Sequence, residues 1–364
     1  MLYDHPMGSA KKAPLASLAL LASALPLLSL SAACANHGIG SRAPSPPPMA
    51  RPAFLVGYDE GWFADHYATD YTSAFDLAYV NRTFDGLVRA GGHVVRLWLF
   101  EGAQGIGMGA GAPRTLGVSR QMLANLELVL AAARARGLWV YVTALDGNET
   151  YAAPGALAPY FKALLNDPNE LEAYLTRVLA PTLAVLDQHR DNVFGFDLMN
   201  EIEAPIQKGV FDDAVGGPRR FMQVTRAFVR AHSPWLPVTS SAGWSTAASD
   251  IASGLFAGVG LDFYDLHAYA DSGEITGSGA VCERARRDGV LVILGEFGQS
   301  SPIVDDAIQS AATERFLSTA RSTCFQAALA WRYDYSALPN SNWFHFIRAD
   351  GSFRPAVSRM QQGR

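Results

Sequence analysis

Short apolar runs alternate with amphipathic stretches along most of this chain, and this alternation limits the possible folds more than any other feature of the sequence. Most of the runs are almost continuously apolar, which is typical of parallel strands that are buried on both faces. Eight such runs follow one another: Phe54–Tyr58, Val94–Phe100, Trp139–Leu145, Val193–Met199, Val238–Ser241, Phe263–Tyr269, Leu291–Phe297 and Ala327–Tyr333.

The segments between these runs carry apolar residues at helical spacing. The clearest helical patterns are Ala74–Arg89, Gln121–Arg136, Leu171–Asp187, Arg219–Arg230 and Asp305–Ser322. Eight strands that alternate with helices over about 300 residues predict a (β/α)8 barrel, and we expect one such TIM-barrel domain of the α/β class over residues 53–364.

A doubly wound sheet is the competing α/β architecture, and its best support is a GxGxxA match at Gly105–Ala110. Pro113 and Arg114 follow the match, so no helix begins at the point where a dinucleotide site needs a helix N-terminus. We therefore interpret this segment as a flexible loop.

The N-terminal segment has the pattern of an export signal. Lys11 and Lys12 precede an apolar run over residues 15–30, and small residues follow it up to Ala35. The run is short for a transmembrane anchor, and Pro26 interrupts it. Residues 1–35 are therefore predicted to be a signal peptide.

Two forms of that signal remain open. Residues 33–35 fit a small-residue cleavage site, whereas Ser-Ala-Ala-Cys over residues 31–34 resembles a bacterial lipoprotein box with a lipid anchor at Cys34. Residues 36–52 are rich in proline and are predicted to be a linker. We expect a protein that is secreted, periplasmic or lipid-anchored at the bacterial envelope.

Composition and charge exclude several classes of protein. With 49% apolar and 17% charged residues, the chain is globular and not disordered. Beyond residue 50, 26 Lys and Arg stand against 33 Asp and Glu, a net charge of −7, so we expect no nucleic-acid partner. No apolar run beyond residue 50 is long enough to span a membrane, so we expect no transmembrane span in the mature protein.

The cysteines do not form a disulfide-rich scaffold, because the chain contains three. Cys282 and Cys324 lie in the predicted barrel, and export would permit a bridge between them. The predicted topology places Cys282 early in one helix and Cys324 at the far end of the next, parallel helix. This geometry argues against a disulfide.

Polar residues follow several predicted strands, at the edge where a (β/α)8 barrel has its active site. Glu201 follows the fourth apolar run after one connecting residue, Asn200, and Glu296 lies at the end of the seventh run, directly after Gly295. Burying a carboxylate is costly unless it is paired, so these two indicate chemistry more than stability. Such a pair suits glycosidic cleavage, in which one carboxyl protonates the leaving oxygen and the other attacks the anomeric carbon.

The order of short motifs at successive strand ends resembles the clan A glycoside hydrolases, whose catalytic carboxylates follow strands 4 and 7. It is most similar to family 5, which contains cellulases and mannanases. The resemblance extends over residues 54–343, and these motifs carry it: Arg96, Asn200–Glu201, His267-Ala268-Tyr269, Gly295–Gly298 and Trp331.

The resemblance implies two catalytic residues and a support for one of them. Glu201 is the expected general acid/base, and Glu296 is the expected nucleophile. Tyr269 is expected to hydrogen-bond Glu296. Arg96 is expected to lie beneath Glu296 and keep it ionised, since a nearby cation lowers the pKa of a carboxyl group.

The resemblance also implies three residues that bind the sugar. Asn200 is expected to bind the 2-hydroxyl, His267 to position the acid/base or the sugar, and Trp331 to form a platform beneath the sugar. Two stretches depart from the family pattern. Residues 145–148 lack the histidine that many members carry after strand 3, and the usual Asn-Glu-Pro is extended over residues 200–205.

Other interpretations of these residues remain open. Arg96 could form a purely structural ion pair, and Glu203 could serve as the acid in place of Glu201. Asp197 and Asp265 lie within strands and are expected to make hydrogen bonds inside the barrel. Among the tryptophans, we expect Trp98, Trp139 and Trp235 in the core, whereas three in loops or at strand ends either stack on sugars or have no special role: Trp62, Trp244 and Trp343.

No metal or cofactor is expected, because the sequence contains no His-Glu-x-x-His and no His-x-His in its first strand. The predicted function is that of an exported, retaining β-glycoside hydrolase whose partner is a carbohydrate: a mannan, a glucan or an exopolysaccharide. Two alternatives are a transglycosylase that remodels surface glycan and a catalytically inactive, glycan-binding barrel.

Overall fold

The computed structural model describes residues 53–109, 114–153, 155, 157–300, 305–334 and 344–362. All of them belong to one compact unit, Pro46–Arg364. The predicted signal peptide 1–35 with Cys34, the linker 36–52 and Trp343 lie outside the described residues. In the described part of the chain, no helix combines the length and apolar character that a membrane span requires.

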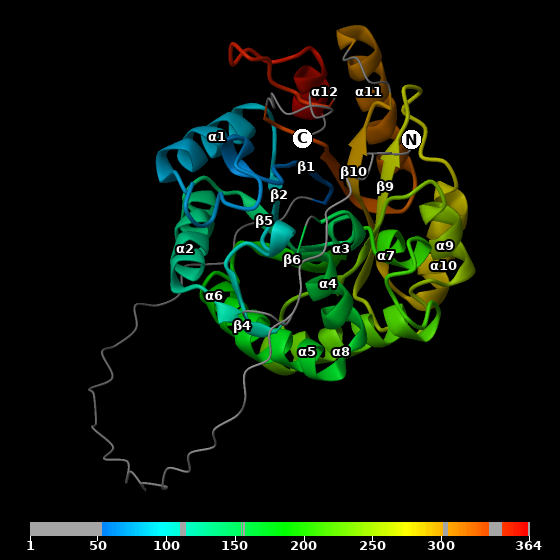
Figure 1. Cartoon of the computed structure of the whole chain (residues 1–364). Helices are drawn as coiled ribbons and strands as arrows, with labels where there is room; N and C mark the ends of the chain where they lie inside the picture. The colour runs from blue at the N-terminus through cyan, green and yellow to red at the C-terminus, as the bar shows by residue number, and fades with distance from the viewer. Residues whose placement is uncertain are drawn as a thin grey trace, which may run out of the picture. The chain divides into compact units, whose positions relative to one another are not determined.

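A ring of parallel strands forms the centre of the molecule (Figure 1), and its sheet order is β7-β6-β5-β2-β1-β11-β10-β9-β8. The strands are β1 (Leu55–Asp59), β2 (Val94–Trp98), β5 (Trp139–Asp146), β6 (Val193–Asn200), β7 (Val238–Thr239), β8 (Ser241–Ala242), β9 (Phe263–Tyr269), β10 (Leu291–Gly298) and β11 (Phe325–Ala330). Strands β7 and β8 are two halves of the fifth predicted run, and they pair with β6 and β9 respectively. The predicted (β/α)8 barrel is therefore confirmed.

Helices lie outside the ring and connect its strands (Figure 1). They are α1 (Leu77–Arg89), α2 (Arg120–Arg134), α3 (Glu149–Ala152), α4 (Leu157–Asn166), α5 (Pro168–Tyr174), α6 (Ala180–Gln188), α7 (Glu203–Gln207), α8 (Gly216–His232), α9 (Ala247–Ser253), α10 (Ser278–Asp288), α11 (Asp306–Ser322) and α12 (Ala356–Gln362). Side-chain caps fix where three of the long helices begin. Asp76, Ser119 and Asp305 accept hydrogen bonds from the first free backbone N–H groups of α1, α2 and α11.

The predicted helix Leu171–Asp187 is interrupted by a short π-helical turn. Its two α-helical parts are α5 and α6, and Leu175–Leu179 forms the turn between them. Pro181 stands just after this turn. Proline has no backbone N–H and therefore cannot donate an intrahelical hydrogen bond to a preceding carbonyl. Two single turns of 3-10 helix, Phe63–Asp65 and Glu101–Ala103, follow β1 and β2.

The GxGxxA segment is not the flexible loop that the sequence analysis expected. Ile106–Met108 forms β3, which pairs antiparallel with β4 (Thr115–Val118) outside the barrel. Gly107 lies opposite Gly117 in this hairpin. The prediction failed because the strand that pairs with β3 lies beyond the motif in the sequence, whereas the motif was judged by the absence of a following helix.

Two apolar layers hold the barrel together. The larger layer lies between the strands and the surrounding helices and includes Phe84, Leu126 and Phe316. The smaller one fills the inside of the barrel with residues from most of its strands: Leu55, Val94, Tyr141, Phe194, Phe263, Ile293, Ala327 and Leu329. This inner layer blocks the barrel interior, so polar groups lie above it at the carboxyl ends of the strands.

A disulfide joins Cys282 to Cys324, with 5.7 Å between their Cα atoms, so the prediction against a bridge was wrong. Helix α10 has 11 residues and begins eight residues after β9 ends, whereas α11 has 17. Because α10 is short, Cys282 lies nearer the end of the barrel at which the strands begin than its early position in the helix suggests. Cys324 lies in the turn that leads into β11, at the same level.

Candidate active site

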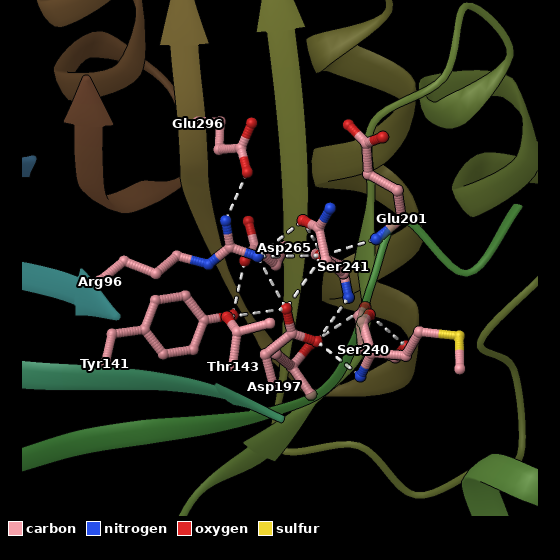
Figure 2. A network of polar contacts seen from close by, with 12 residues as sticks. Arg96, Tyr141, Thr143, Asp197, Glu201, Ser240, Ser241, Asp265 and Glu296 are labelled. Atoms are coloured by element: carbon pink, nitrogen blue, oxygen red, sulfur yellow. Dashed lines mark hydrogen bonds and ion pairs between the residues drawn. The ribbon is translucent and has the colours of Figure 1, made fainter. Parts of the chain in front are cut away.

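Arg96 lies at the centre of the polar network that covers the inner apolar layer (Figure 2). It projects from β2 and is fully buried. Its Nη1 donates to Asp59 at 3.1 Å and to Glu296, and its Nη2 donates to Asp197 at 2.8 Å. One guanidinium thus compensates three buried carboxylates that come from β1, β6 and β10.

Glu296 is placed by an irregularity in β10. The pairing of β10 with β9 shifts by one residue between Leu294 and Glu296, which is the signature of a β-bulge at Gly295. Both oxygens of Glu296 are occupied, because Arg96 donates to Oε1 and the Tyr269 hydroxyl donates to Oε2 at 2.5 Å. These two donors fix the direction of the carboxyl group. The predicted contacts of Glu296 with Arg96 and Tyr269 are both present.

Glu201 follows β6 in a conformation that is unusual for a residue with a side chain. Its φ is +50°, in the left-handed region, and its backbone N–H donates to Ser241 Oγ at 3.0 Å. Such a conformation is retained where neighbouring structure imposes it, and it is common at functional sites. Gly243 leaves the space for the side chain, since a Cβ there would lie 2.1 Å from Glu201 Oε1.

The carboxyl group of Glu201 has a different environment from that of Glu296. The side chain is 14% exposed, and burial raises its pKa above the ordinary value of a glutamate. Hydrogen bonds from Asn148 and Trp244 and the charge of Arg96 act in the opposite direction. The Asn148 Nδ2 donates to Glu201 Oε2 at 2.9 Å.

His267 lies between the two glutamates. Its Nδ1 is 3.1 Å from Glu201 Oε1 and 3.5 Å from Glu296 Oε2, and one polar atom of each of the three residues falls within 4.8 Å of the others. Burial lowers the pKa of His267 to about 4, so the ring is neutral near pH 7. The neutral ring can place one N–H between the carboxyl groups without adding charge.

Asn200 ties the two sides of the network together. Its Oδ1 accepts from Arg96 Nη2 at 2.9 Å, and its Nδ2 donates to Asp146 Oδ1 at 2.9 Å. One hydrogen of the Nδ2 group therefore remains for another acceptor. Burial raises the pKa of Asp146 to about 7.

Trp331 follows β11 and packs within a group of three tryptophans. Its ring centroid lies 5.3 Å from that of Trp98 and 5.9 Å from that of Trp62. Trp98 is buried, as expected, but it supports Trp331 and is not remote from the site. The Arg332 guanidinium lies 4.8 Å from the Trp62 ring centroid and is paired with buried Glu60 at 3.4 Å.

The remaining tryptophans divide as follows. Trp139 packs against the inner apolar layer and Trp235 against the outer one, as predicted. Trp244 lies beside Glu201, and its ring makes an edge contact with the Tyr151 ring at 6.3 Å between centroids. Lys208 Nζ lies within 5.5 Å of both ring centroids. Trp62 and Trp244 are thus both near the site, on opposite sides of it.

The structure also shows which contacts the other carboxylates make. Asp197 accepts from Arg96, Thr143 and Ser241, and Asp265 accepts from the Tyr141 hydroxyl at 2.6 Å, so both make the predicted bonds inside the barrel. Glu203 is buried in α7 and accepts from the backbone N–H of Trp244. It is Glu201, not Glu203, that lies within 4.8 Å of His267 and Glu296.

Sequence analysis missed four residues of the site: Asp59, Glu60, Tyr141 and Asn148. Asp59 and Glu60 follow the first apolar run, so the strand-end rule that found Glu201 would have found them. Tyr141 lies inside a strand and gives no such signal. Asn148 follows the third run, but it was noted only as a departure from the expected histidine.

Solved structures of β-mannanases superpose on this chain. The β-mannanase from the blue mussel Mytilus edulis has a TM-score of 0.63 and 17% identity, over 85% of this chain and 92% of that one. The endo-1,4-β-mannanase from Eisenia fetida has a TM-score of 0.65 and 17% identity, over 85% and 90%. This chain has the fold of the β-mannanases.

One further solved structure is an exo-acting enzyme, and two other comparisons found no match. An exo-β-1,4-mannosidase from Opitutaceae bacterium strain TAV5 has a TM-score of 0.64 and 16% identity, over 85% of this chain and 59% of that one. No family model and no curated protein matches the sequence. At these identities the comparisons show the fold, and the activity is argued below from the site.

Proposed function

We propose that this protein is a retaining β-glycoside hydrolase of clan A, close to family 5. The observation that carries the proposal is the pair Glu201 and Glu296, which bring carboxyl oxygens within 4.8 Å of each other in unlike environments. A separation near 5 Å suits double displacement, in which no water stands between the second carboxylate and the sugar.

In the first step, Glu296 is the nucleophile. Arg96 and Tyr269 favour its ionised form and point one of its oxygens toward the sugar. Glu201, whose pKa burial raises, holds the proton that goes to the leaving oxygen. The glycosidic bond breaks as the ester bond between Glu296 and the anomeric carbon forms.

In the second step, the same two residues exchange tasks. Glu201 is now ionised and takes a proton from water, whose oxygen attacks the anomeric carbon and displaces Glu296. The Tyr269 and Arg96 donors stabilise Glu296 as its charge returns. His267 lies between the two carboxyl groups and is neutral. It therefore adds no positive charge that would favour the ionised form of both glutamates.

The sugar contacts follow from the same geometry. The free hydrogen of Asn200 Nδ2 is suited to the 2-hydroxyl, and the Trp331 ring is suited to stack beneath the sugar that is cleaved. Because the leaving oxygen lies against Glu201, the leaving group extends toward Tyr151 and Trp244. The solved neighbours are named as β-mannanases, so a β-mannan is the first substrate to test.

Metal-dependent chemistry is the second candidate, because Glu201, His267 and Glu296 could in geometry surround a divalent cation. We favour the glycosidase, since the guanidinium of Arg96 already contacts Glu296 and would repel a cation bound there. Export is part of the proposal as well. It is supported by the Cys282–Cys324 disulfide, because such bonds persist in oxidising compartments.

The proposal is tested by product analysis. The full chain is incubated with β-mannan, β-glucan, xylan and bacterial exopolysaccharides, with and without a chelator, and products are identified by mass spectrometry. We expect shortened oligosaccharides from one of these polymers, unaffected by the chelator and absent for Glu201→Ala and Glu296→Ala. Products longer than the substrate indicate transglycosylation, and loss of products with the chelator favours the metal reaction.

A further inference from the structure

The loop at the end of β5 contacts the proposed acid/base, Glu201. The family resemblance does not predict this contact. The loop consists of Asp146, which ends β5, and of Gly147 and Asn148, and the resemblance expects a histidine here that touches the sugar. In this chain the loop contacts Glu201 instead, through the 2.9 Å hydrogen bond from Asn148 Nδ2 to Glu201 Oε2.

The orientation of the Asn148 amide is fixed by two carboxylates. Its Nδ2 lies 3.4 Å from Asp146 Oδ1 as well as 2.9 Å from Glu201 Oε2. Its backbone N–H donates to the same Asp146 oxygen at 3.1 Å, and the Tyr151 hydroxyl donates to its Oδ1 at 3.5 Å. A carbonyl oxygen in place of Nδ2 would face both carboxylates, so the amide must present its NH2 group to Glu201.

Gly147 allows the loop to lie directly on the backbone that carries Glu201. A Cβ at Gly147 would stand 2.4 Å from the carbonyl oxygen of Glu201 and 2.6 Å from that of Asn200. The Gly147 N–H donates to the Asn200 oxygen at 2.8 Å. Since Asp146 also accepts from Asn200 Nδ2, the loop holds both residues of the Asn-Glu pair.

The two oxygens of Glu201 therefore have different donors. Oε1 faces His267 Nδ1, and Oε2 faces Asn148 Nδ2. A donor to a carboxylate oxygen favours the ionised form, which the second step needs, whereas burial favours the neutral form, which the first step needs. An amide suits this position because it donates without carrying a charge.

We propose that Asn148 is a positioning residue for Glu201, which fixes the direction of its carboxyl group and stabilises its ionised form. This inference rests on the proposed function. Without the Asn148 donor, Glu201 keeps its proton to higher pH, and the alkaline limit of activity moves upward. A residue with a merely structural role would lower activity or stability without moving that limit.

The test compares the full chain with Asn148→Ala, Asn148→Asp and Asn148→His. On an aryl β-glycoside that the wild type cleaves, we expect the alkaline limb of kcat/KM to rise by about one pH unit in Asn148→Ala. The limb rises further in Asn148→Asp, which adds a negative charge, and returns toward the wild-type position in Asn148→His, which restores an N–H donor.

Asn169 provides a matched control. Its backbone N–H and Nδ2 donate to Asp167 Oδ1 at 2.9 and 3.1 Å, as those of Asn148 do to Asp146, but it lies at the start of α5, and its Nδ2 bonds Asp167 and not Glu201. Asn169→Ala removes the same local turn, and we expect the limb to stay in place.

A second measurement does not depend on turnover. Carbon-13 NMR of glutamate-labelled protein, with Glu201→Gln used for assignment, reports the pKa of Glu201 directly. We expect a higher pKa in Asn148→Ala. An unchanged Glu201 titration in that variant overturns the inference even when the wild type is active. If the wild type cleaves no substrate but the pKa of Glu201 still rises in Asn148→Ala, the proposed function is contradicted. The inferred effect of Asn148 on Glu201 is then still supported.

Discussion

At the scale of single residues, the site depends on giving two like side chains unlike surroundings. Glu296 has a cation and a hydroxyl on its oxygens, whereas Glu201 is buried with neutral donors. The pKa of Glu201 is raised by burial, so this carboxyl is the one suited to hold a proton, and glycosidic cleavage requires two carboxyl groups in unlike surroundings. The site requires the glycines around Glu201 as well as the polar groups, because a larger residue at these positions would occupy the space of Glu201.

Gly243→Ala tests that space. The added Cβ would stand 2.1 Å from Glu201 Oε1 and 2.7 Å from His267 Nδ1, so one of these groups must move. A displacement of this size predicts a loss of about 100-fold or more in kcat/KM. Gly279→Ala is the control, because a Cβ at Gly279 in α10 meets no atom within 4 Å. Near-native kcat/KM in Gly243→Ala would contradict the placement of Glu201.

At the scale of elements, the strands place the site and the connections between them complete it. The strand ends were recognisable from the sequence because an apolar run followed by a polar residue is a local signal. Asn148, Gly243 and the disulfide were not, because each acts through a contact with a distant segment. The bulge at Gly295 belongs to the same class, since a register shift depends on the partner strand.

The Cys282–Cys324 disulfide predicts a stability effect at this scale. It joins α10 to the turn before β11 and spans a sequence separation of 42 residues. Replacing both cysteines with serine is expected to lower the free energy of unfolding by about 3–4 kcal/mol, measured by urea denaturation. Reduction of the wild type should give a similar loss. Free thiols at Cys282 and Cys324 in the purified, unreduced protein would show that the bridge is absent.

At the scale of the whole molecule, many ionisable side chains are buried above the inner apolar layer of the barrel. The fold itself could be predicted from the eightfold alternation, because that pattern is repeated along the chain. A local misprediction, such as the missed hairpin that contains Ile106–Met108, does not change it. The buried charge did not follow from it. Glu60 and Asp265 are compensated by residues that only the closed ring brings near them, Arg332 and Tyr141.

This buried charge predicts how stability depends on pH. Burial raises the pKa of Glu60 and Asp265 to about 8 and that of Asp146 to about 7, well above their values in an unfolded chain. Between about pH 4 and pH 8 the folded state therefore binds more protons, and stability falls as pH rises. The surface carboxyls with lowered pKa, such as Asp85 and Asp306, act below this range.

Thermal unfolding checks this dependence. We expect Tm to be higher at pH 5 than at pH 8.5, and the difference to shrink in Asp265→Asn, which removes one of the buried titrating groups and keeps a side chain of similar size. A Tm that rises steadily from pH 5 to pH 8.5 would contradict the assignment of raised pKa values to these buried carboxyl groups.

The central claim is that Glu296 forms a covalent bond to the sugar while Glu201 transfers the proton. The most direct test is to trap that intermediate with 2-deoxy-2-fluoro β-glycosides of the manno and gluco series that carry a good leaving group. The account predicts that the intact protein gains the mass of one fluorosugar and that peptide mapping places it on Glu296. A label on Glu201 or on any other residue would contradict the account.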